Sequence, residues 1–534
     1  MTTHESSGRA GNGISRPRRL LEAVQVKNNE SGSSKSKFGK WSNIDLDPTP
    51  PSQRIWTSWS FFAYQFSIAF SPTTYNVGAS LYAIGLNWWT IFIASIIVSI
   101  LIAILLYLNS RGSVWYHIGY PTIIRSSAGI YGSLVYIAIR GVVAVLYMAI
   151  QSFYAILPAS AGITSSGLLA FGILWLLQLP FAFIHPSKVN MVFRVKSVLA
   201  PIGLIATLIW ALKSSGGADF KGLSTSEEAR GPALAWAFMK AINAIVSNVI
   251  PPLVNIADLA RYGSRPSQTI PMPVGLVISK PLVTFLGMVI TAAGYKQFGE
   301  AYWNLWDFYS SVLDKYWGPG ARTLIFLAAA IQAFATFATN LSSNSIPVGS
   351  DLAGLFPKYF TIVRGQILCF FLAWACVPWK LTYSAASFLS FLSSYLCFIC
   401  PIVACMVVDY WLVRKGNLHV PSLYSTNPDS PYYFTKGFNL RAFGSWFAAI
   451  LIVIPGVANT IAPGSIGIAA IWPVKLYPSK YSDRPKTWEC MRHTEGFFME
   501  DDCYPEHLAE NTVLDAEKGS DDGKMDTKKG MSQE

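Results

Sequence analysis

The sequence predicts an all-α polytopic membrane protein, and three features support this: its composition, its recurring apolar runs and two interruptions in those runs. The chain has 534 residues, of which 52% are hydrophobic and 13% charged, whereas soluble proteins carry about 25% charged residues. Apolar runs near the roughly 20 residues that cross a bilayer recur between Trp56 and Ala462. Two runs lying five spans apart are broken by proline and polar residues, which is typical of an inverted five-plus-five repeat.

Eleven apolar segments are clear enough to be expected as transmembrane helices. They are residues 56–86, 88–108, 134–157, 168–184, 193–212, 233–254, 271–293, 324–345, 366–379, 386–413 and 443–462. A twelfth, GSIGIAAIWPVKLYP at residues 464–478, is short and interrupted by proline. The sequence therefore predicts about 11–12 transmembrane helices.

The two ends of the chain differ from the transporter domain expected over residues 56–478. Residues 1–55 and 479–534 are polar, and we expect disordered cytoplasmic tails, the first with a motif at residues 43–56. No apolar leader precedes the first span, so that span is expected to direct insertion. Lysines such as Lys518 make ubiquitin machinery a candidate partner of the tails, with a merely solvated tail as the alternative.

Basic residues concentrate in the loops after the even-numbered spans. Arg111 and Arg125 follow the second span, and Lys188, Arg194 and Lys196 follow the fourth. Loops rich in Lys and Arg face the cytoplasm, so we expect these loops and the N-terminus there. Eleven spans would leave the C-terminus outside, whereas twelve would return it inside, which suits a tail rich in Lys and Asp.

The segment SNVIPPLVNIADLARYG, residues 247–263, places two prolines where the sixth span should continue. Proline lacks a backbone donor and clashes with the preceding turn, and backbone groups freed inside a membrane must line a protein-buried cavity. The first span carries a matching fault in AFSPTTYNVGAS, residues 69–80. We expect discontinuous first and sixth helices around a central site, with two simple proline kinks as the alternative. The expected lining residues are Ser71, Pro72, Thr73, Thr74, Pro251 and Pro252.

Polar side chains on the third and eighth spans are candidates for ligand binding. Tyr147 and Gln151 lie one turn apart on one helical face of LYMAIQSFY. A phenol ring stacks on flat heterocycles, and an amide both donates and accepts hydrogen bonds. Asn340 and Asn344 have the same spacing in the eighth span, where asparagine is costly unless it faces a partner. The alternative for these residues is hydrogen bonding between helices.

Charged residues near one end of the sixth span suggest a gate. Asp258 and Arg261 lie at i and i+3 and are expected to pair at the cytoplasmic end of the helix. No span shows a strong mid-span carboxylate. Proton coupling would therefore have to use carboxylates at helix ends or a less direct route.

Other chemistries find no support in the sequence. It has no P-loop, GxSxG or HExxH motif, and its six histidines form no metal-ligand pattern. Its seven cysteines give no disulfide framework. The formal charge of +12 is spread over short loops as membrane anchors and is not gathered on a nucleic-acid-binding face. We expect neither an enzyme nor a metal, a cofactor or a nucleic-acid partner.

Longer motifs carry a family resemblance. NIDLDPTPPSQRIW, FIHPSKVNMVFRVKSVLAP, NIADLARYG and DYWLVRKGNL belong to a set that runs from Asn43 to Asn459. Together they resemble the nucleobase–cation symporter-1 family, in its fungal Fur-type branch of uracil, allantoin and uridine permeases. The resemblance implies a LeuT-type fold with two inverted five-helix repeats, alternating access and proton symport.

The resemblance also implies which residues bind the substrate. In the family a Trp and a Gln on the third span bind the ring, and this chain has Tyr147 and Gln151 there. At the sixth-span break a glycine and an aromatic residue are replaced by Ser247 and Asn248. The eighth-span asparagine of the family matches Asn344. With Asn340 one turn earlier, the expected substrate-binding residues are Tyr147, Gln151, Ser247, Asn248, Asn340 and Asn344.

A sodium site in bacterial relatives corresponds to Ala335, Ala338 and Thr339 on the eighth span. The family site uses backbone carbonyls and a Ser-Thr pair, and the Ser hydroxyl is lost at Ala338. This loss weakens a sodium site and favours coupling to protons, or no coupling.

We expect a multi-pass plasma-membrane protein, surrounded by lipid, that imports uracil, allantoin, a purine or a nucleoside with protons. One alternative keeps the fold and carries thiamine, pyridoxine or nicotinamide riboside. The other is a non-transporting receptor or degenerate paralogue, which the altered Tyr147, the altered Ser247-Asn248 pair and the short last span keep open. No ring of charges or filter-like loop indicates a channel.

Overall fold

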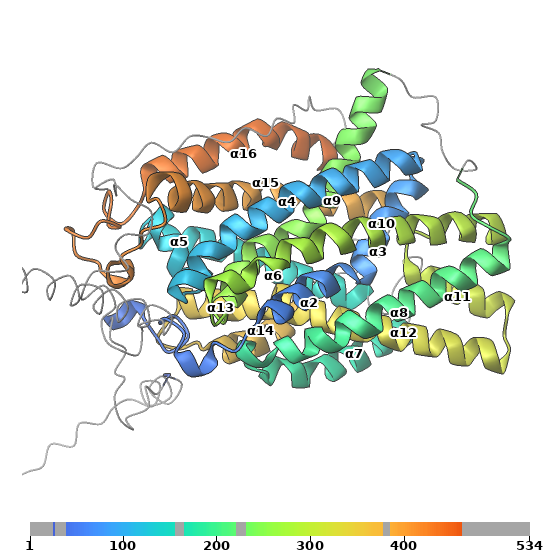
Figure 1. Cartoon of the computed structure of the whole chain (residues 1–534), viewed down its shortest axis with the longest axis horizontal. Coiled ribbons are helices and arrows are strands. Elements are labelled where there is room, and N and C mark those ends of the chain that lie inside the picture. The colour runs from blue at the N-terminus through green and yellow to red at the C-terminus, as the bar shows by residue number, and fades with distance from the viewer. Residues whose placement is uncertain (1–24, 27–38, 155–164, 221–230, 377–384, 462–534) are drawn as a thin grey trace, which may run out of the picture.

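The structure is a computed structural model that describes residues 25–26, 39–154, 165–220, 231–376 and 385–461. Within these ranges the regular structure is helical, apart from two isolated β-bridges. Figure 1 shows long helices running side by side along the molecule. The expected twelfth segment and the expected C-terminal tail lie outside the described residues, as does most of the expected N-terminal tail.

Helices occupy all eleven of the clear apolar segments, which confirms the predicted all-α architecture. In chain order they are α2 (Ser58–Ala69) with α3 (Pro72–Ala83), α4 (Trp88–Tyr116), α6 (Gly132–Tyr154), α7 (Ser165–Gln178), α8 (Asn190–Ser215), α9 (Pro232–Ala260), α10 (Pro271–Phe298), α12 (Pro319–Asn340) with η6 (Leu341–Ser345) and α13 (Ile346–Leu355), α14 (Ile362–Ala375), α15 (Ala385–Val408) with η8 (Asp409–Val413), and α16 (Leu440–Ile461). Six helices in the described ranges are by themselves long and apolar enough to cross a membrane.

Shorter helices connect these elements. They are α5 (Tyr120–Ala128), α11 (Leu305–Lys315), η1 (Gly39–Trp41), η2 (Pro51–Gln53), η3 (Leu179–Phe183), η4 (Pro186–Lys188), η5 (Pro266–Thr269) and η9 (Val420–Tyr424).

The break predicted in the first span is confirmed. Two residues separate α2 from α3, and Pro72 takes the first position of α3, where its missing N–H would have had no helical acceptor. The Ser71 hydroxyl lies 3.0 Å from that of Thr73 and 3.4 Å from that of Thr74. These hydroxyls bond to one another at a point where the backbone leaves the helical pattern.

The sixth span differs from its prediction, because α9 is a single helix that passes through Pro251 and Pro252. Pro251 has no N–H to donate to the carbonyl of Ser247, which lies four residues earlier. The Tyr395 hydroxyl of α15 donates to that carbonyl instead. An outside donor thus replaces the missing helical bond, and this corrects the expectation of a discontinuous sixth helix.

Glycines allow α10 to lie close against the broken first span. α10 packs on α2, α3 and α4, and α4 packs on α9. A Cβ at Gly78 of α3 would lie 2.1 Å from the Thr284 carbonyl oxygen, and one at Gly287 of α10 would lie 2.4 Å from the Tyr75 carbonyl oxygen. Small residues permit such approaches between membrane helices. These helices form a first group that holds the break of the first span.

A second group of helices is built around the eighth span. α13 packs on α6 and α14, and α12 packs on α8. Between α12 and α13 the chain forms the π-helical turn η6, a feature frequent at functional sites. The candidate site lies where the two groups meet.

Residues 43–56 pack on one end of the bundle, so the expected disorder of the N-terminal tail is corrected over this part. The Asn43 amide donates to the carbonyls of Pro357 (3.1 Å) and Phe360 (2.9 Å). The Trp56 indole donates to the carbonyl of Ser187 (3.1 Å). We call this end, which also carries α5 and lies at the left in Figure 1, the N-terminal end of the bundle.

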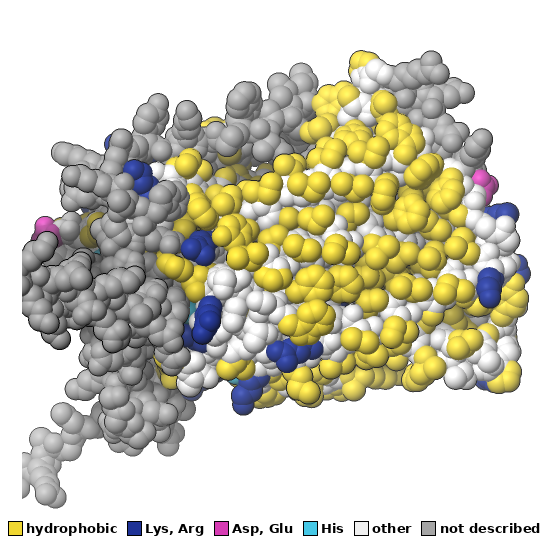
Figure 2. Space-filling view, in the orientation of Figure 1, with side chains coloured by type: hydrophobic (Ala, Val, Ile, Leu, Met, Phe, Trp, Pro, Cys, Tyr) yellow, Lys and Arg dark blue, Asp and Glu magenta, His cyan; other side chains and the backbone are white. Residues whose placement is uncertain are grey.

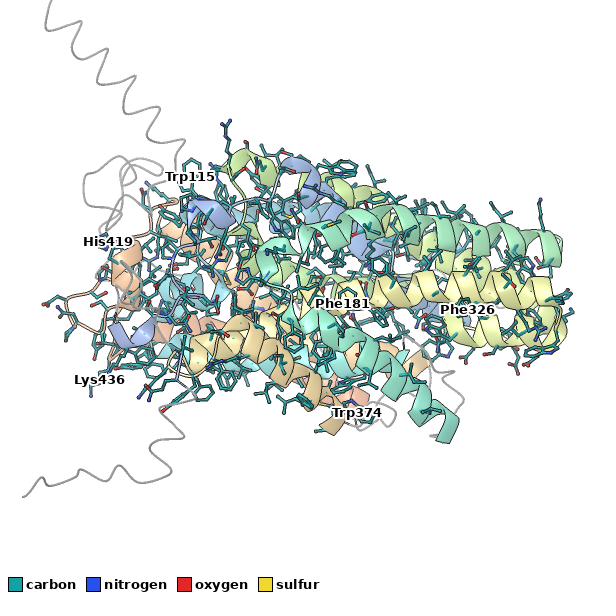
Figure 3. The ribbon with its side chains drawn as sticks, turned by 90° about the horizontal axis from the view of Figure 1, so that it is seen from below. Trp115, Phe181, Phe326, Trp374, His419 and Lys436 are labelled. Atoms are coloured by element: carbon teal, nitrogen blue, oxygen red, sulfur yellow. The ribbon has the colours of Figure 1, made fainter. Side chains whose placement is uncertain are left out.

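Many large apolar side chains of the described helices are exposed. Figure 2 shows hydrophobic side chains over much of the described part of the displayed face, with Lys and Arg in its left-hand part and at its right-hand edge. Leu101 and Ile104 of α4 are each 55% exposed, and Phe326 of α12 is 70% exposed. In Figure 3, Phe326 lies toward one end of the bundle, while His419 and Lys436 lie at the other. An exposed apolar band between polar ends is what a bilayer requires.

Candidate functional site

A cavity lies between the broken first span and helices α6, α9, α10, α12 and η6. It encloses about 380 Å³ of space not filled by protein atoms, part of it open to solvent. Its lining residues are Ile68, Ala69, Ser71, Thr73, Thr74, Tyr147, Gln151, Asn248, Val249, Pro251, Pro252, Leu276, Lys280, Thr339 and Ser343.

The cavity brings together residues that the sequence predicted for separate reasons. The expected residues in its wall are Ser71, Thr73, Thr74, Tyr147, Gln151, Asn248, Pro251, Pro252 and Thr339. The expected residues outside its wall are Pro72, Ser247, Ala335, Ala338, Asn340 and Asn344. The Ser247 hydroxyl is engaged within its own helix, where it donates to the carbonyl of Asn243 (2.6 Å).

Tyr147 is held at the wall by a second tyrosine. Its ring meets that of Tyr395 edge to face, with centroids 5.1 Å apart and planes at 82°, and the two hydroxyl oxygens are 2.8 Å apart. Because Tyr395 also bonds the Ser247 carbonyl, the ring is linked to the proline-containing turn of α9.

Gln151 begins a chain of side-chain amides that leads away from the cavity. Its Oε1 accepts a hydrogen bond from Asn344 Nδ2 (3.0 Å), which also donates to Asn340 Oδ1 (2.8 Å). Asn340 in turn donates to the Ser152 hydroxyl (3.1 Å) and to Gln178 Oε1 (3.3 Å). The two asparagines therefore orient Gln151 from behind the wall, and its Nε2 group can donate to a ligand.

The span-six part of the wall is polar. Asn248 Oδ1 accepts from the Thr74 hydroxyl at 3.1 Å and from Lys280 Nζ. Lys280 Nζ also donates to the Thr74 hydroxyl at 3.3 Å. An amide, a hydroxyl and an amine from α9, α3 and α10 thus form one hydrogen-bonded group. It lies at the position where the resemblance implied that Asn248 replaces an aromatic residue.

The position expected for a former cation site contains a lysine. Lys196 of α8 is fully buried, and its Nζ donates to the Thr339 hydroxyl (2.6 Å), which in turn donates to the carbonyl of Ala335 (2.9 Å). Lys196 was expected in a cytoplasmic loop, but it lies inside α8 and its side chain is buried. A side-chain amine therefore already contacts the hydroxyl that would have been a cation ligand.

A buried charge cluster lies between the cavity and the N-terminal end of the bundle. Arg140 of α6 lies 2.7 Å from Asp258 of α9 and 2.6 Å from Asp351 of α13. Its guanidinium stands 3.7 Å from the ring centroid of Tyr120. Asp258 also accepts from the backbone N–H of Tyr120 (3.0 Å) and from the Ser350 hydroxyl (2.7 Å). One arginine thereby joins three spans, because it pairs with a carboxylate on each of the other two.

The expected pair of Asp258 with Arg261 is therefore corrected. Arg261 donates instead to the carbonyls of Asp45 (2.6 Å) and Asp47 (2.5 Å) and to the Thr49 hydroxyl (2.5 Å). It fastens the N-terminal motif to α9. Asp258 and Arg261 therefore take part in adjacent but separate contacts. The predicted pair was wrong because Arg140 was not recognised from the sequence as the partner of Asp258.

Three buried basic residues were missed as site residues by sequence reasoning: Arg140, Lys196 and Lys280. Arg140 and Lys280 lie inside the apolar runs YIAIRGVV and LVISKPLV. A basic residue within a membrane span is a candidate functional residue by default. That signal was available for these two, whereas Lys196 was masked by its closeness to a basic loop.

Comparison with known proteins places the chain in a family. The family model described as permease for cytosine/purines, uracil, thiamine, allantoin matches residues 48–471. The allantoin permease of Saccharomyces cerevisiae is 29% identical over 451 residues, covering 80% of this chain and 71% of that protein. The uridine permease of the same yeast is 31% identical over 470 residues, covering 82% and 72%.

Solved structures agree on the fold. The closed conformation of MHP1, a nucleobase-cation-symport-1 family transporter with bromovinylhydantoin bound, aligns with a TM-score of 0.61 at 20% identity, covering 78% of this chain and 96% of that chain. This likeness confirms the predicted LeuT-type fold. Since the family model spans most of the sequence, the chain belongs to the nucleobase–cation symporter family of permeases for cytosine/purines, uracil, thiamine and allantoin.

Proposed function

We propose that this permease imports a small, flat, polar heterocycle of the nucleobase or allantoin type, and that the cavity is its binding site. The observation that carries the proposal is the pairing of the Tyr147 ring with the Gln151 amide in one wall. The ring offers a stacking face. The amide is oriented by Asn344 so that its Nε2 can donate to a ring carbonyl of the substrate.

Proton coupling is the second part of the proposal. Lys196 Nζ bonds the Thr339 hydroxyl at the position of the expected cation site. An amine that gains and loses a proton there would alternate between a fixed cation and a neutral group, whereas a sodium ion would have to displace it. Lysine changes its protonation readily when buried, so Lys196 is a better coupling candidate than the helix-end carboxylates considered from the sequence.

Alternating access requires a closure that can open and close. The cluster of Arg140 with Asp258 and Asp351 joins α6, α9 and α13 between the cavity and the N-terminal end of the bundle. We propose that these ion pairs separate when the site opens toward that end. We further propose that this end faces the cytoplasm and that the membrane is the plasma membrane.

The proposal is tested by uptake into cells that lack their own purine, pyrimidine, allantoin and thiamine permeases. Labelled uracil, allantoin, uric acid, uridine and thiamine are offered one at a time, in acidic and in neutral medium, after surface expression has been verified. Saturable, acid-stimulated and sodium-independent uptake of a base or ureide is the expected result. Uptake of thiamine alone would contradict the substrate class, and a sodium requirement would contradict the coupling.

A further inference from the structure

We propose that Lys280 is a specificity-determining residue that makes the site select heterocycles carrying a negative charge and reject cations. The inference rests on the proposed function of the cavity and narrows its substrate class. It assigns to Lys280 a contact with an anionic oxygen of the substrate, such as a carboxylate on the ring or the oxygen of a deprotonated ring amide.

The location of Lys280 requires an explanation. It lies well inside α10, is 1% exposed and lines the cavity. Lysines near the ends of membrane helices extend their amines to the water interface. Lys296, in the last turn of the same helix, is exposed and donates to the carbonyl of Gly216 (2.9 Å). Lys280 lies too far from the helix ends to extend its amine to the water interface. A lysine buried in a membrane span is typically retained for a partner or a ligand.

The partners of Lys280 leave its charge uncompensated. In the described part of the chain its Nζ contacts two acceptors, the Thr74 hydroxyl and Asn248 Oδ1, and both are neutral. No carboxylate among the described residues forms an ion pair with it. Arg140, the other basic residue recognised within an apolar run, pairs with two carboxylates. An ammonium group has three N–H donors, so one remains beyond the two that these acceptors take.

A bound anion would complete this arrangement. It would accept the remaining N–H in a charge-assisted hydrogen bond, which is stronger than one between neutral groups, and would neutralise the buried charge. A substrate cation would instead meet a like charge at short range, which is unfavourable. The same cavity therefore offers a ring contact at Tyr147, a donor at Gln151 and an anion contact at Lys280.

The test uses a matched pair of probes, uracil and uracil-6-carboxylate, which share a ring and differ in charge. Each competes for uptake of the best-transported labelled heterocycle, and thermal-shift binding to the purified full-length protein is measured in parallel. We expect the wild type to bind uracil-6-carboxylate more tightly than uracil. In Lys280→Met the apparent affinity for the carboxylate should fall by about tenfold or more. The apparent affinity for uracil should change by no more than about threefold in the same variant. Thiamine should compete poorly with the wild type and better with Lys280→Met.

Two further variants keep the result interpretable. Lys280→Arg retains the charge and should keep the preference for the carboxylate, whereas Lys296→Met removes a lysine from the same helix outside the cavity and should leave the ratio unchanged. The proposed role of Lys280 would be overturned if Lys280→Met lost affinity for both probes equally. It would also be overturned if this variant still bound the carboxylate more tightly than uracil. A wild type that binds uracil more tightly than its carboxylate would overturn it also. Failure of the wild type to bind any heterocycle would refute the proposed function itself, which separates the two failures.

Discussion

Replacing Gln151 with alanine removes the amide that we expect to specify the substrate ring. Two hydrogen bonds are lost: the one to a ring carbonyl of the substrate, and the one that Asn344 Nδ2 donates to Gln151 Oε1 at 3.0 Å. The second bond is internal to the protein and is present without substrate, so its loss affects the stability of the protein and does not by itself weaken substrate binding. The same Nδ2 still donates to Asn340 Oδ1 at 2.8 Å. A net hydrogen bond contributes about 0.5–1.5 kcal/mol, and a buried polar group left unpaired costs about 1–3 kcal/mol.

We therefore expect Gln151→Ala to weaken substrate binding by about 1.5–3 kcal/mol, which is about 10- to 150-fold in apparent affinity. The assay is competition by unlabelled substrate, with surface expression measured for each variant. Gln297→Ala is the matched control, because Gln297 lies in the last turns of α10 and donates to the Tyr316 hydroxyl (3.1 Å) outside the cavity. An affinity within about threefold of the wild type for Gln151→Ala would remove Gln151 from the site and refute the reasoning.

Substitutions at three further positions, Tyr147, Lys196 and Gly287, test other contacts in the structure. Tyr147→Phe keeps the ring and loses the hydrogen bond to Tyr395, so the affinity for substrate should fall by no more than about tenfold. Tyr147→Ala also removes the ring and should lower this affinity further. Equal losses in the two variants would argue against stacking. Lys196→Met should abolish the acid stimulation of uptake, and an unchanged pH profile would exclude Lys196 from coupling. Gly287→Ala should lower the thermal unfolding midpoint, because its Cβ would lie 2.4 Å from the Tyr75 carbonyl oxygen. Gly320→Ala is the control, because a Cβ there would meet nothing within 4 Å. Equal midpoints for the two variants would contradict the close packing of α3 and α10.

The sequence predicted best where the signal is local. The Ser-Pro pair at residues 71–72 breaks the first span, and the proline and the interruption of the helix lie in the same turn. The Tyr147–Gln151 spacing placed both residues in one cavity wall, since helical periodicity fixes their common face.

Prediction failed where a partner lies far away in the chain. α9 continues as one helix through its prolines, and Tyr395, 148 residues from Ser247, supplies the donor that Pro251 lacks. Asp258 was expected to pair with its helical neighbour Arg261, yet Arg140 reaches it from another span. Lys196 was assigned to a loop because charge counting cannot tell a buried amine near a helix start from an exposed one. Each of these outcomes depends on how the spans pack together.

An experimental structure of the full-length protein with its best-transported heterocycle bound would show whether the cavity beside the broken first span binds the substrate. We expect the ring to lie against Tyr147, with a carbonyl within hydrogen-bonding distance of Gln151 Nε2. A ligand bound elsewhere, with Tyr147 and Gln151 out of contact, would contradict this expectation.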